Sequence, residues 1–199
     1  MISFQKRFLF VHIPKTGGNS IQSILARYSE DKIVRRPGQD GVERFGVSNP
    51  KYKLKKHSPL AAYREALGEE QFSRLYKFAC VRNPWERMVS FYFTPGQGKK
   101  WDRKAFKKTI SKTLSAADYL RLEEGERDPF CNVERIIRFE NLAEDFQLVC
   151  ADLAIPGEPL PKYNRSEREH YSKYYDDDLR ALVAERFAAE IARFSYTFD

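Results

Sequence analysis

The sequence predicts an α/β fold with a central parallel sheet flanked by helices. Apolar segments of strand type lie at residues 7–13, 76–81 and 133–139, and each precedes a stretch with the apolar spacing of a helix. Strands that alternate with helices form a parallel sheet covered on both faces. A chain of 199 residues suits one domain with a sizeable core, so we expect a single domain over residues 1–199.

The first strand ends in a turn that can hold an anion. Residues 7–13 stop at Pro14, and a helix is expected over residues 18–28 after Lys15, Thr16, Gly17 and Gly18. Glycines let the backbone turn with its N–H groups pointing inward, and a helix start carries partial positive charge. A phosphate or sulfate group would bind there, although these residues also suit a plain strand-to-helix connection. The lysine and threonine precede the glycines, so the order G-x-x-x-x-G-K-[ST] of nucleotide triphosphatases is absent.

Residues 30–56 are polar and rich in turn signals, among them Pro37-Gly38 and Asn49-Pro50. We expect an irregular, mobile loop or lid on the side of the molecule where an acceptor would bind. A short helix should follow from Ser58-Pro59 to Gly68.

A second anion-binding element follows the strand at residues 76–81. Arg82 stands at the strand end, Asn83 is a suitable helix cap, and Pro84 suits the first helical position. A core-facing stripe is formed by Trp85, Met88, Val89 and Tyr92. Arg82 and Ser90 would form an anion site on another face, unless Arg82 pairs with a core carboxylate and Ser90 only packs. A magnesium-dependent kinase is expected to offer an acidic residue at a strand end, where it binds the metal. The arginine at this strand end favours a group donor that needs no magnesium.

The remaining elements follow from apolar spacing and capping residues. The basic stretch 99–124 is expected to be helical, with a core stripe of Phe106, Ile110 and Leu114. After the strand at 133–139, Asn141 should cap a helix whose inward residues are Leu142, Phe146, Val149 and Leu153. Asp176 should cap the last helix, whose inward residues are Leu179, Leu182, Val183, Phe187 and Ile191.

The net charge and the cysteines limit the classes of protein that fit this sequence. The formal net charge is +7, with basic residues gathered at 51–56 and 99–112, which suits polyanionic ligands as well as an ordinary solvated surface. No segment has the length of a transmembrane helix, and no signal peptide, zinc-finger or RNA-recognition pattern occurs. The three cysteines lack metal-ligand spacing and suit reduced thiols. We therefore expect a cytoplasmic protein that requires no metal and binds no nucleic acid.

Two of these segments together resemble the cofactor motifs of sulfotransferases that use 3′-phosphoadenosine 5′-phosphosulfate (PAPS). They are Val11-His-Ile-Pro-Lys-Thr-Gly-Gly-Asn-Ser-Ile21 and Phe78-Ala-Cys-Val-Arg-Asn-Pro-Trp-Glu-Arg-Met-Val-Ser-Phe-Tyr92. The likeness is to the carbohydrate branch with heparan and chondroitin-type enzymes and their small bacterial relatives, and it continues weakly at residues 138–142 and 160–166. It implies a P-loop-like three-layer fold. It also implies sulfuryl transfer from PAPS to a hydroxyl or amine of a carbohydrate or similar acceptor, with 3′,5′-bisphosphoadenosine (PAP) as product.

The resemblance also implies roles for individual residues. Lys15 would stabilise charge on the oxygen that bridges sulfur and the 5′-phosphate, helped by the N–H groups of residues 16–20 and nearby hydroxyls. Arg82 and Ser90 would hold the 3′-phosphate, with Arg165 as a third candidate ligand. The candidate cofactor-binding residues are therefore Lys15, Thr16, Gly17, Gly18, Asn19, Ser20, Arg82, Ser90 and Arg165.

An acceptor hydroxyl needs a base, and the chain has three histidines. His57 follows a basic cluster that should keep its imidazole neutral, and related heparan-type enzymes carry a histidine in this region. We assign His57 as the catalytic base beside Lys15, while a solvated or capping role for His57 stays open. His12 is expected to be a hydrogen-bonded core residue and His170 to be exposed. Glu140 is a rival base, although a salt bridge to a nearby arginine suits it better.

Two other functions fit the same residues. A divergent P-loop-type kinase or nucleotide phosphotransferase would use the turn for ATP, and a non-catalytic module would bind polyanions through its basic clusters. A preference for ATP with magnesium would support the kinase. Polyanion binding without nucleotide affinity would support the module. The sequence leaves the acceptor and the oligomeric state open.

Overall fold

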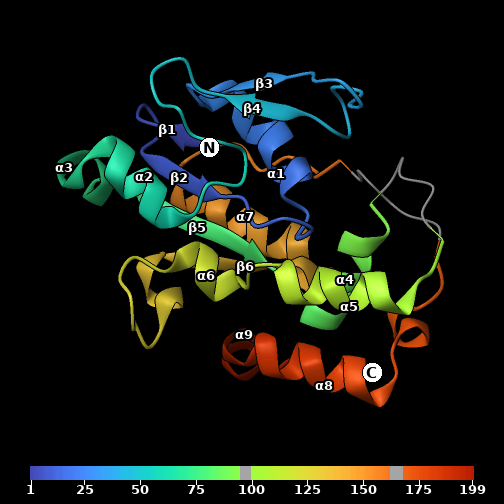
Figure 1. Cartoon of the computed structure of the whole chain (residues 1–199). Coiled ribbons are helices and arrows are strands. Elements are labelled where there is room, and N and C mark those ends of the chain that lie inside the picture. The colour runs from blue at the N-terminus through green and yellow to red at the C-terminus, as the bar shows by residue number, and fades with distance from the viewer. Residues whose placement is uncertain (95–99, 162–167) are drawn as a thin grey trace.

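The computed structural model describes residues 1–94, 100–161 and 168–199, and a four-stranded sheet lies at its centre (Figure 1). The strands run in the order β1 (Ile2–Ser3), β2 (Phe8–Val11), β5 (Tyr76–Val81) and β6 (Arg135–Arg138). β2, β5 and β6 are parallel, and β1 adds an antiparallel edge strand. The predicted parallel sheet is confirmed, and the three predicted strands form it.

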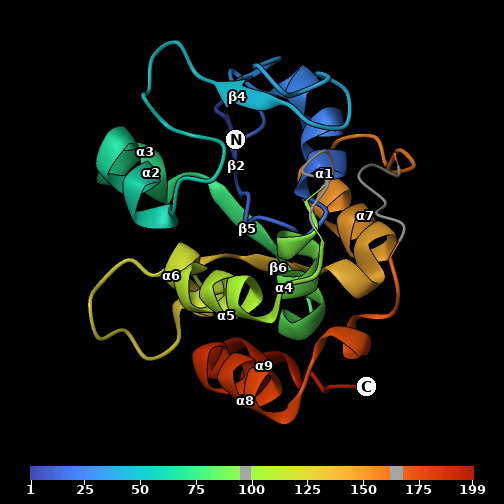
Figure 2. The same ribbon diagram turned by 45° about the vertical axis from the view of Figure 1, so that its right-hand side comes forward.

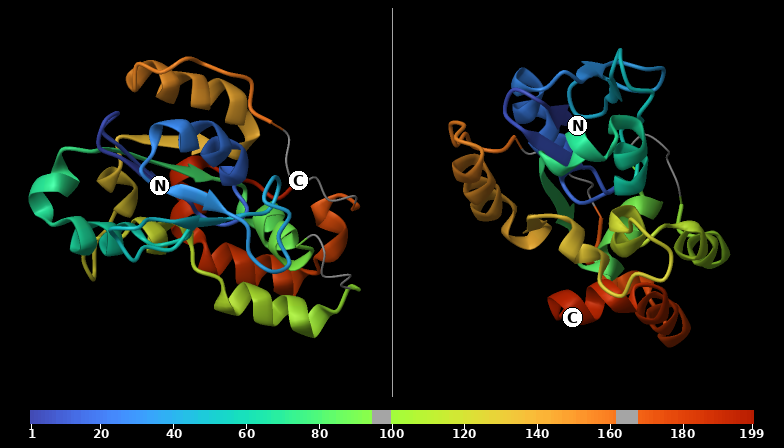
Figure 3. Two further views of the ribbon diagram at one scale, coloured as in Figure 1. Left: turned by 90° about the horizontal axis from the view of Figure 1, so that it is seen from above. Right: turned by 90° about the vertical axis from the view of Figure 1, so that its left-hand side faces the viewer.

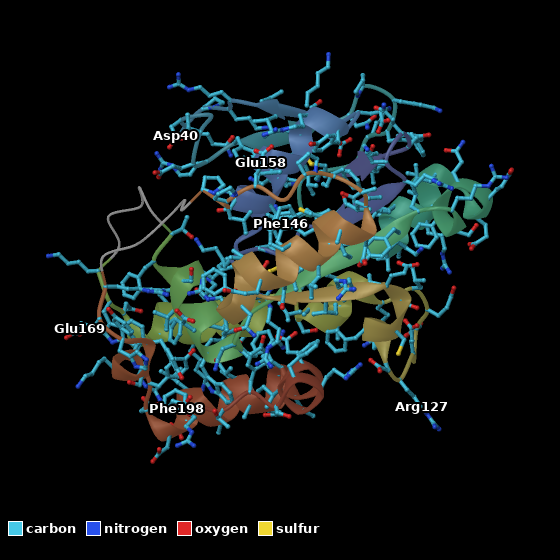
Figure 4. The ribbon with its side chains drawn as sticks, turned by 180° about the vertical axis from the view of Figure 1, so that it is seen from behind. Asp40, Arg127, Phe146, Glu158, Glu169 and Phe198 are labelled. Atoms are coloured by element: carbon cyan, nitrogen blue, oxygen red, sulfur yellow. The ribbon has the colours of Figure 1, made fainter. Side chains whose placement is uncertain are left out.

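Side chains that alternate along the strands build an apolar layer on each face of the sheet. One layer packs against α1 (Gly18–Leu25) and α7 (Leu142–Asp152), and its strand residues are Phe8, Phe10, Phe78, Cys80 and Ile137. The other packs against helices that include α2 (Leu60–Leu67) and α4 (Pro84–Tyr92), and its strand residues are Leu9, Val11, Ala79 and Val81. Figure 4 looks onto the first face, where α7 carries the labelled Phe146. Helices therefore cover both faces, as predicted.

The remaining helices extend the second face. They are α3 (Glu69–Ser73), α5 (Arg103–Lys112), α6 (Ala116–Leu120), α8 (Asp177–Arg186) and α9 (Ala188–Phe194). Short 3₁₀ turns occur elsewhere in the fold, at Ala26–Tyr28, Pro129–Asn132, Phe139–Asn141 and Tyr171–Tyr174. Figure 2 shows α5, α8 and α9 on one side of the sheet. Asp176 caps α8, as predicted, because its carboxylate accepts from the Leu179 N–H at 2.9 Å.

The structure differs from local expectations at several places. Residues 30–56 are irregular over most of their length but contain an antiparallel hairpin of β3 (Lys32–Val34) and β4 (Gly46–Ser48), which Figure 3 shows from above. The basic stretch is broken between α5 and α6 because Ser115 and Asp118 form a capping box that starts a new helix, and Leu114 is left 49% exposed. Asn141 precedes α7, but its side chain makes no capping hydrogen bond.

The three cysteines are free. Cys80 and Cys150 are buried, and Cys131 is exposed. Within the described parts of the chain, no helix has the length and apolar character needed to cross a membrane.

Candidate functional site

A cavity of about 940 Å³ lies at the carboxyl ends of β2 and β5. Its walls come from the turn after β2, from α4, from the segment between β3 and β4, and from residues 168–171. In Figure 4, Asp40 and Glu169, from two of these regions, are labelled at the same edge of the molecule. Ligands of parallel α/β sheets bind at this edge. The fold therefore brings both predicted anion motifs to one cavity.

The turn after β2 presents a row of backbone N–H groups. Lys15 and Gly17 have left-handed backbone conformations, with φ of 70° and 85°, and α1 begins at Gly18. Among the described residues, nothing accepts a hydrogen bond from the N–H groups of residues 15–19. Ser20 differs from expectation because its N–H donates to the Gly17 carbonyl at 3.1 Å. Consecutive unpaired N–H groups at a helix start are suited to bind an anion.

Close packing explains both glycines of the turn. A Cβ at Gly17 would lie 2.8 Å from Leu142 Cδ2, and the positive φ also disfavours a side chain there. A Cβ at Gly18 would lie 2.2 Å from Cδ2 of His12. The His12 imidazole therefore rests directly against the Gly18 backbone, and a side chain at position 18 would push it aside.

Lys15 is half-buried in the cavity wall. Burial, together with the charges of Arg82 and Arg168, lowers the pKa of Lys15 to about 8. Lys15, Arg82 and Arg168 all line this cavity. A bound anion would offset their mutual repulsion and raise the pKa of Lys15 again.

Two residues of the predicted anion set use their side chains differently. Thr16 is fully buried, and its hydroxyl donates to the Ile13 carbonyl at 2.8 Å instead of facing the cavity. Asn19 donates from its side-chain amide to the Glu43 carbonyl at 2.5 Å, which ties α1 to the segment between β3 and β4. What Thr16 and Asn19 offer to an anion is thus a backbone N–H. Ser20 does line the cavity.

The second motif forms a charged cluster in the same cavity. Arg82 donates to the Glu86 carboxylate at 2.5 and 3.3 Å and to the Lys15 carbonyl at 3.2 Å. Its guanidinium also lies 3.8 Å from the centre of the Phe139 ring. Arg168 approaches Glu86 at 3.6 Å, and its buried Nη1 finds no acceptor among the described residues. Arg82 is therefore ion-paired, as one interpretation of the sequence allowed, but its partner belongs to the cavity wall and not to the core.

Helix α4 holds this cluster in a fixed orientation. The Asn83 side chain accepts from the N–H groups of Trp85 at 3.1 Å and Glu86 at 3.4 Å, as predicted for a cap. The predicted core residues Trp85, Met88, Val89 and Tyr92 are all buried. Ser90 follows Glu86 by one helical turn and also lines the cavity. Arg82, Glu86 and Ser90 thus form one side of the site.

His57 lines the cavity with one ring nitrogen already engaged. Its Nδ1 lies 2.8 Å from the His12 carbonyl, so Nδ1 carries the proton and Nε2 is left as an acceptor. His57 is exposed on the side that faces the cavity. Desolvation by the surrounding protein atoms, with the charges of Lys56 and Lys15, outweighs the bond to His12 and holds the pKa of His57 below its ordinary value. A neutral imidazole with a free nitrogen can take a proton.

Two more side chains complete this part of the cavity. His12 is buried and lies 2.9 Å from the Gln22 side-chain oxygen, which confirms it as a hydrogen-bonded core histidine. Its ring also meets that of His57, with centroids 4.5 Å apart. Lys56 donates to the Phe45 carbonyl at 2.7 Å, and burial lowers the pKa of Lys56 to about 8.

The remaining candidates stand apart from this group. Glu140 accepts from the Asn83 N–H at 2.7 Å and lies 4.0 Å from Arg138, so its partners are structural. His170 is exposed at the cavity rim. Arg165 lies outside the described residues. Within the described ranges, no group of three or more His, Cys, Asp or Glu side chains could hold a metal ion.

A profile of the sulfotransferase family matches residues 1–126, which include the turn after β2, His57 and the second anion motif. The chain belongs to the sulfotransferase family. The chemistry of this family is sulfuryl transfer, and its P-loop-like α/β fold agrees with the fold predicted here. No curated protein and no solved structure gives a significant match.

Sequence reasoning missed three cavity residues of this sulfotransferase. Glu86 did carry a signal, because it stands four residues after Arg82, a spacing at which opposite charges pair. Arg168 carried no such signal in the sequence, because it reaches the cavity only through the path that the chain takes after α7. Lys56 precedes His57 directly, but only the hairpin places Phe45 against it.

Proposed function

We propose that this sulfotransferase moves a sulfuryl group from PAPS to a hydroxyl, or an amine, of a carbohydrate or similar acceptor. Lys15 and His57 are the proposed catalytic residues. The proposal rests on one observation: a single cavity is lined both by a turn whose N–H groups have no acceptor among the described residues and by a histidine whose Nδ1 is bonded to a main-chain carbonyl. The donor supplies an activated sulfuryl group, whose bond to a phosphate oxygen breaks as the bond to the acceptor oxygen forms.

The two anion sites suit a donor that is negatively charged at both ends. Lys15 and the N–H groups of residues 15–19 would meet the phosphosulfate. Arg82, Arg168 and Ser90 would meet the 3′-phosphate, which ATP lacks. The buried Nη1 of Arg168 has no acceptor among the described residues, and a phosphate oxygen would supply one.

The proton of the acceptor hydroxyl would pass to Nε2 of His57. The bond from Nδ1 to the His12 carbonyl fixes the tautomer that this step needs. Lys15 stays protonated below about pH 8 and would offset the negative charge that grows on the leaving phosphate oxygen. PAP then leaves with the electron pair of the broken S–O bond, and the proton remains on His57.

The residues beside His57 favour an acceptor with a negative charge. The Lys56 ammonium lies 3.9 Å from the centre of the Phe45 ring, and both residues line the cavity. Phe45 is fully buried, so this part of the cavity offers the acceptor the positive charge of Lys56, which attracts carboxylate or sulfate groups. An acidic glycan fits this charge.

Two measurements test the proposal together. Calorimetry should show that PAP binds without magnesium and more tightly than ATP. Incubation with PAPS and a panel of glycans and metabolites, followed by mass spectrometry, should show sulfate in at least one product. A preference for ATP that requires magnesium would contradict the donor, and binding of long polyanions without any nucleotide affinity would contradict the enzyme.

A further inference from the structure

Lys15 has a left-handed backbone with φ of 70°. This conformation is unfavourable for a lysine and persists where neighbouring contacts fix it. Arginines hold the carbonyls on both sides of the strained residue. Arg87 Nε donates to the Pro14 carbonyl at 3.1 Å, and Arg82 Nη1 donates to the Lys15 carbonyl at 3.2 Å. The second motif therefore fixes the backbone of the first.

Arg87 makes these contacts from the interior of the protein, where it is 1% exposed. Its Nη2 donates to the Leu114 carbonyl at 2.9 Å. Its Nη1 makes no hydrogen bond among the described residues and lies 3.6 Å from Oε1 of Glu190. A buried guanidinium is costly without a counter-charge, and Glu190 is the carboxylate within reach.

Glu190 belongs to α9 and is equally buried. Its Oε2 accepts from the Ala116 N–H at 2.5 Å, which leaves Oε1 facing Arg87. Burial raises the pKa of Glu190, and the Arg87 charge opposes that rise. Helix α9, which lies beyond the residues matched by the family profile, is thus connected through one arginine to the anion-binding turn.

We infer that Arg87 is a positioning residue for sulfuryl transfer, which holds the peptide between Pro14 and Lys15 while Glu190 holds Arg87. Pro14 and Lys15 line the cavity, whereas Arg87 lies behind them. The inference rests on the proposed role of Lys15. Displacement of a catalytic group by about 1 Å can lower a rate by about a hundredfold, so the effect on turnover should be large.

The test is the double variant Arg87→Met/Glu190→Leu. Apolar residues of similar volume in place of a buried ion pair usually preserve or raise stability, while this change removes the donor to Pro14. We expect the double variant to fold with a modestly lowered thermal midpoint, because main-chain groups of Pro14, Leu114 and Ala116 lose their partners. We also expect kcat lowered by about a hundredfold and faster backbone motion of residues 15–18 in amide relaxation measurements. Arg186→Met is the matched control, because Arg186 donates to the Thr113 carbonyl at 3.2 Å, one residue from Leu114.

Unchanged kcat and unchanged motion of residues 15–18 in the double variant would overturn the inference. Should the double variant not fold, Arg87→Lys keeps the charge opposite Glu190 but loses the planar group that reaches two carbonyls. Parent-like kcat and relaxation in Arg87→Lys would overturn it as well. The relaxation readout needs no donor, so an inactive parent protein would contradict the proposed function and leave the inference about Arg87 to be decided by backbone motion.

Discussion

Nδ1 of His57 donates a hydrogen bond to the main-chain carbonyl of His12 across 2.8 Å. His12 is the residue directly after β2, the strand that leads into the turn with Lys15. The orientation of the proposed base is therefore set by the same strand that positions Lys15. His57 comes from a loop, but its hydrogen-bond partner is a main-chain atom at the edge of the central sheet. The sheet therefore fixes the orientation of the His57 ring.

Replacement of His57 by alanine should abolish transfer while nucleotide binding is spared. Loss of a general base lowers the rate by about a hundred- to ten-thousandfold, and no contact to the donor phosphates is removed. Steady-state kinetics and PAP calorimetry on His57→Ala measure the two effects. Lys55→Ala, an exposed neighbour, should behave like the parent. If His57→Ala keeps its turnover, the base must be another group.

Replacement of Lys15 by alanine should lower kcat by about a hundredfold or more, as removal of other charge-stabilising groups does. The loss should appear in kcat and not only in KM, because the charge that Lys15 offsets develops in the transition state. The matched substitution Lys53→Ala removes an exposed lysine and should leave kcat unchanged. Equal turnover in Lys15→Ala and the parent would remove the proposed role of Lys15.

The pH dependence of kcat/KM should be displaced toward acid on both limbs. The pKa of His57 is lowered, so the neutral base persists below the pH at which an ordinary histidine becomes protonated. The pKa of Lys15 is lowered to about 8, so activity should fall as the pH rises through that value. The alkaline fall of kcat itself should occur at a higher pH, since a bound anionic donor favours the ammonium form of Lys15. A kcat/KM profile that stays flat to pH 10 would contradict the assignment of Lys15.

Replacement of Gly18 by alanine should damage both stability and turnover. The added Cβ would lie 2.2 Å from the His12 ring, which is buried and cannot move freely. Overpacking of this kind costs about 1–3 kcal/mol, measurable by denaturant unfolding. Gly157→Ala is the control, because its Cβ would meet only the end of the Gln147 side chain. If both variants lose the same free energy of unfolding, the contact between Gly18 and His12 makes no specific contribution to stability.

Replacement of Arg168 by glutamine should weaken PAP binding by about ten- to a hundredfold, the range expected for loss of a hydrogen bond to a charged group. Adenosine 5′-monophosphate, which lacks the 3′-phosphate, should bind the variant and the parent equally. Calorimetry with the two nucleotides measures the difference, and Arg193→Gln, an exposed arginine of α9, is the matched control. Equal losses for both nucleotides would place Arg168 away from the 3′-phosphate.

The sequence was informative where structure is decided locally. Asn83 and Asp176 cap their helices because capping depends on a few neighbouring residues, and the short apolar run 76–81 is the buried strand that its composition predicts. Leu114 was misplaced because apolar spacing cannot show that Ser115 starts a new helix. Arg168 and the hydroxyl of Thr16 could not be placed from spacing, since their partners come from distant segments or from the interior of the turn.

The hairpin formed by β3 and β4 shares no strand with the central sheet, and side chains from other segments hold main-chain carbonyls of its connecting segment. Asn19 donates to the Glu43 carbonyl, and Lys56 donates to the Phe45 carbonyl. These bonds do not involve side chains of the connecting segment, so an exposed residue there, such as Val42, can be exchanged without disturbing the central sheet. A change of acceptor through such residues would leave the proposed donor site as it is.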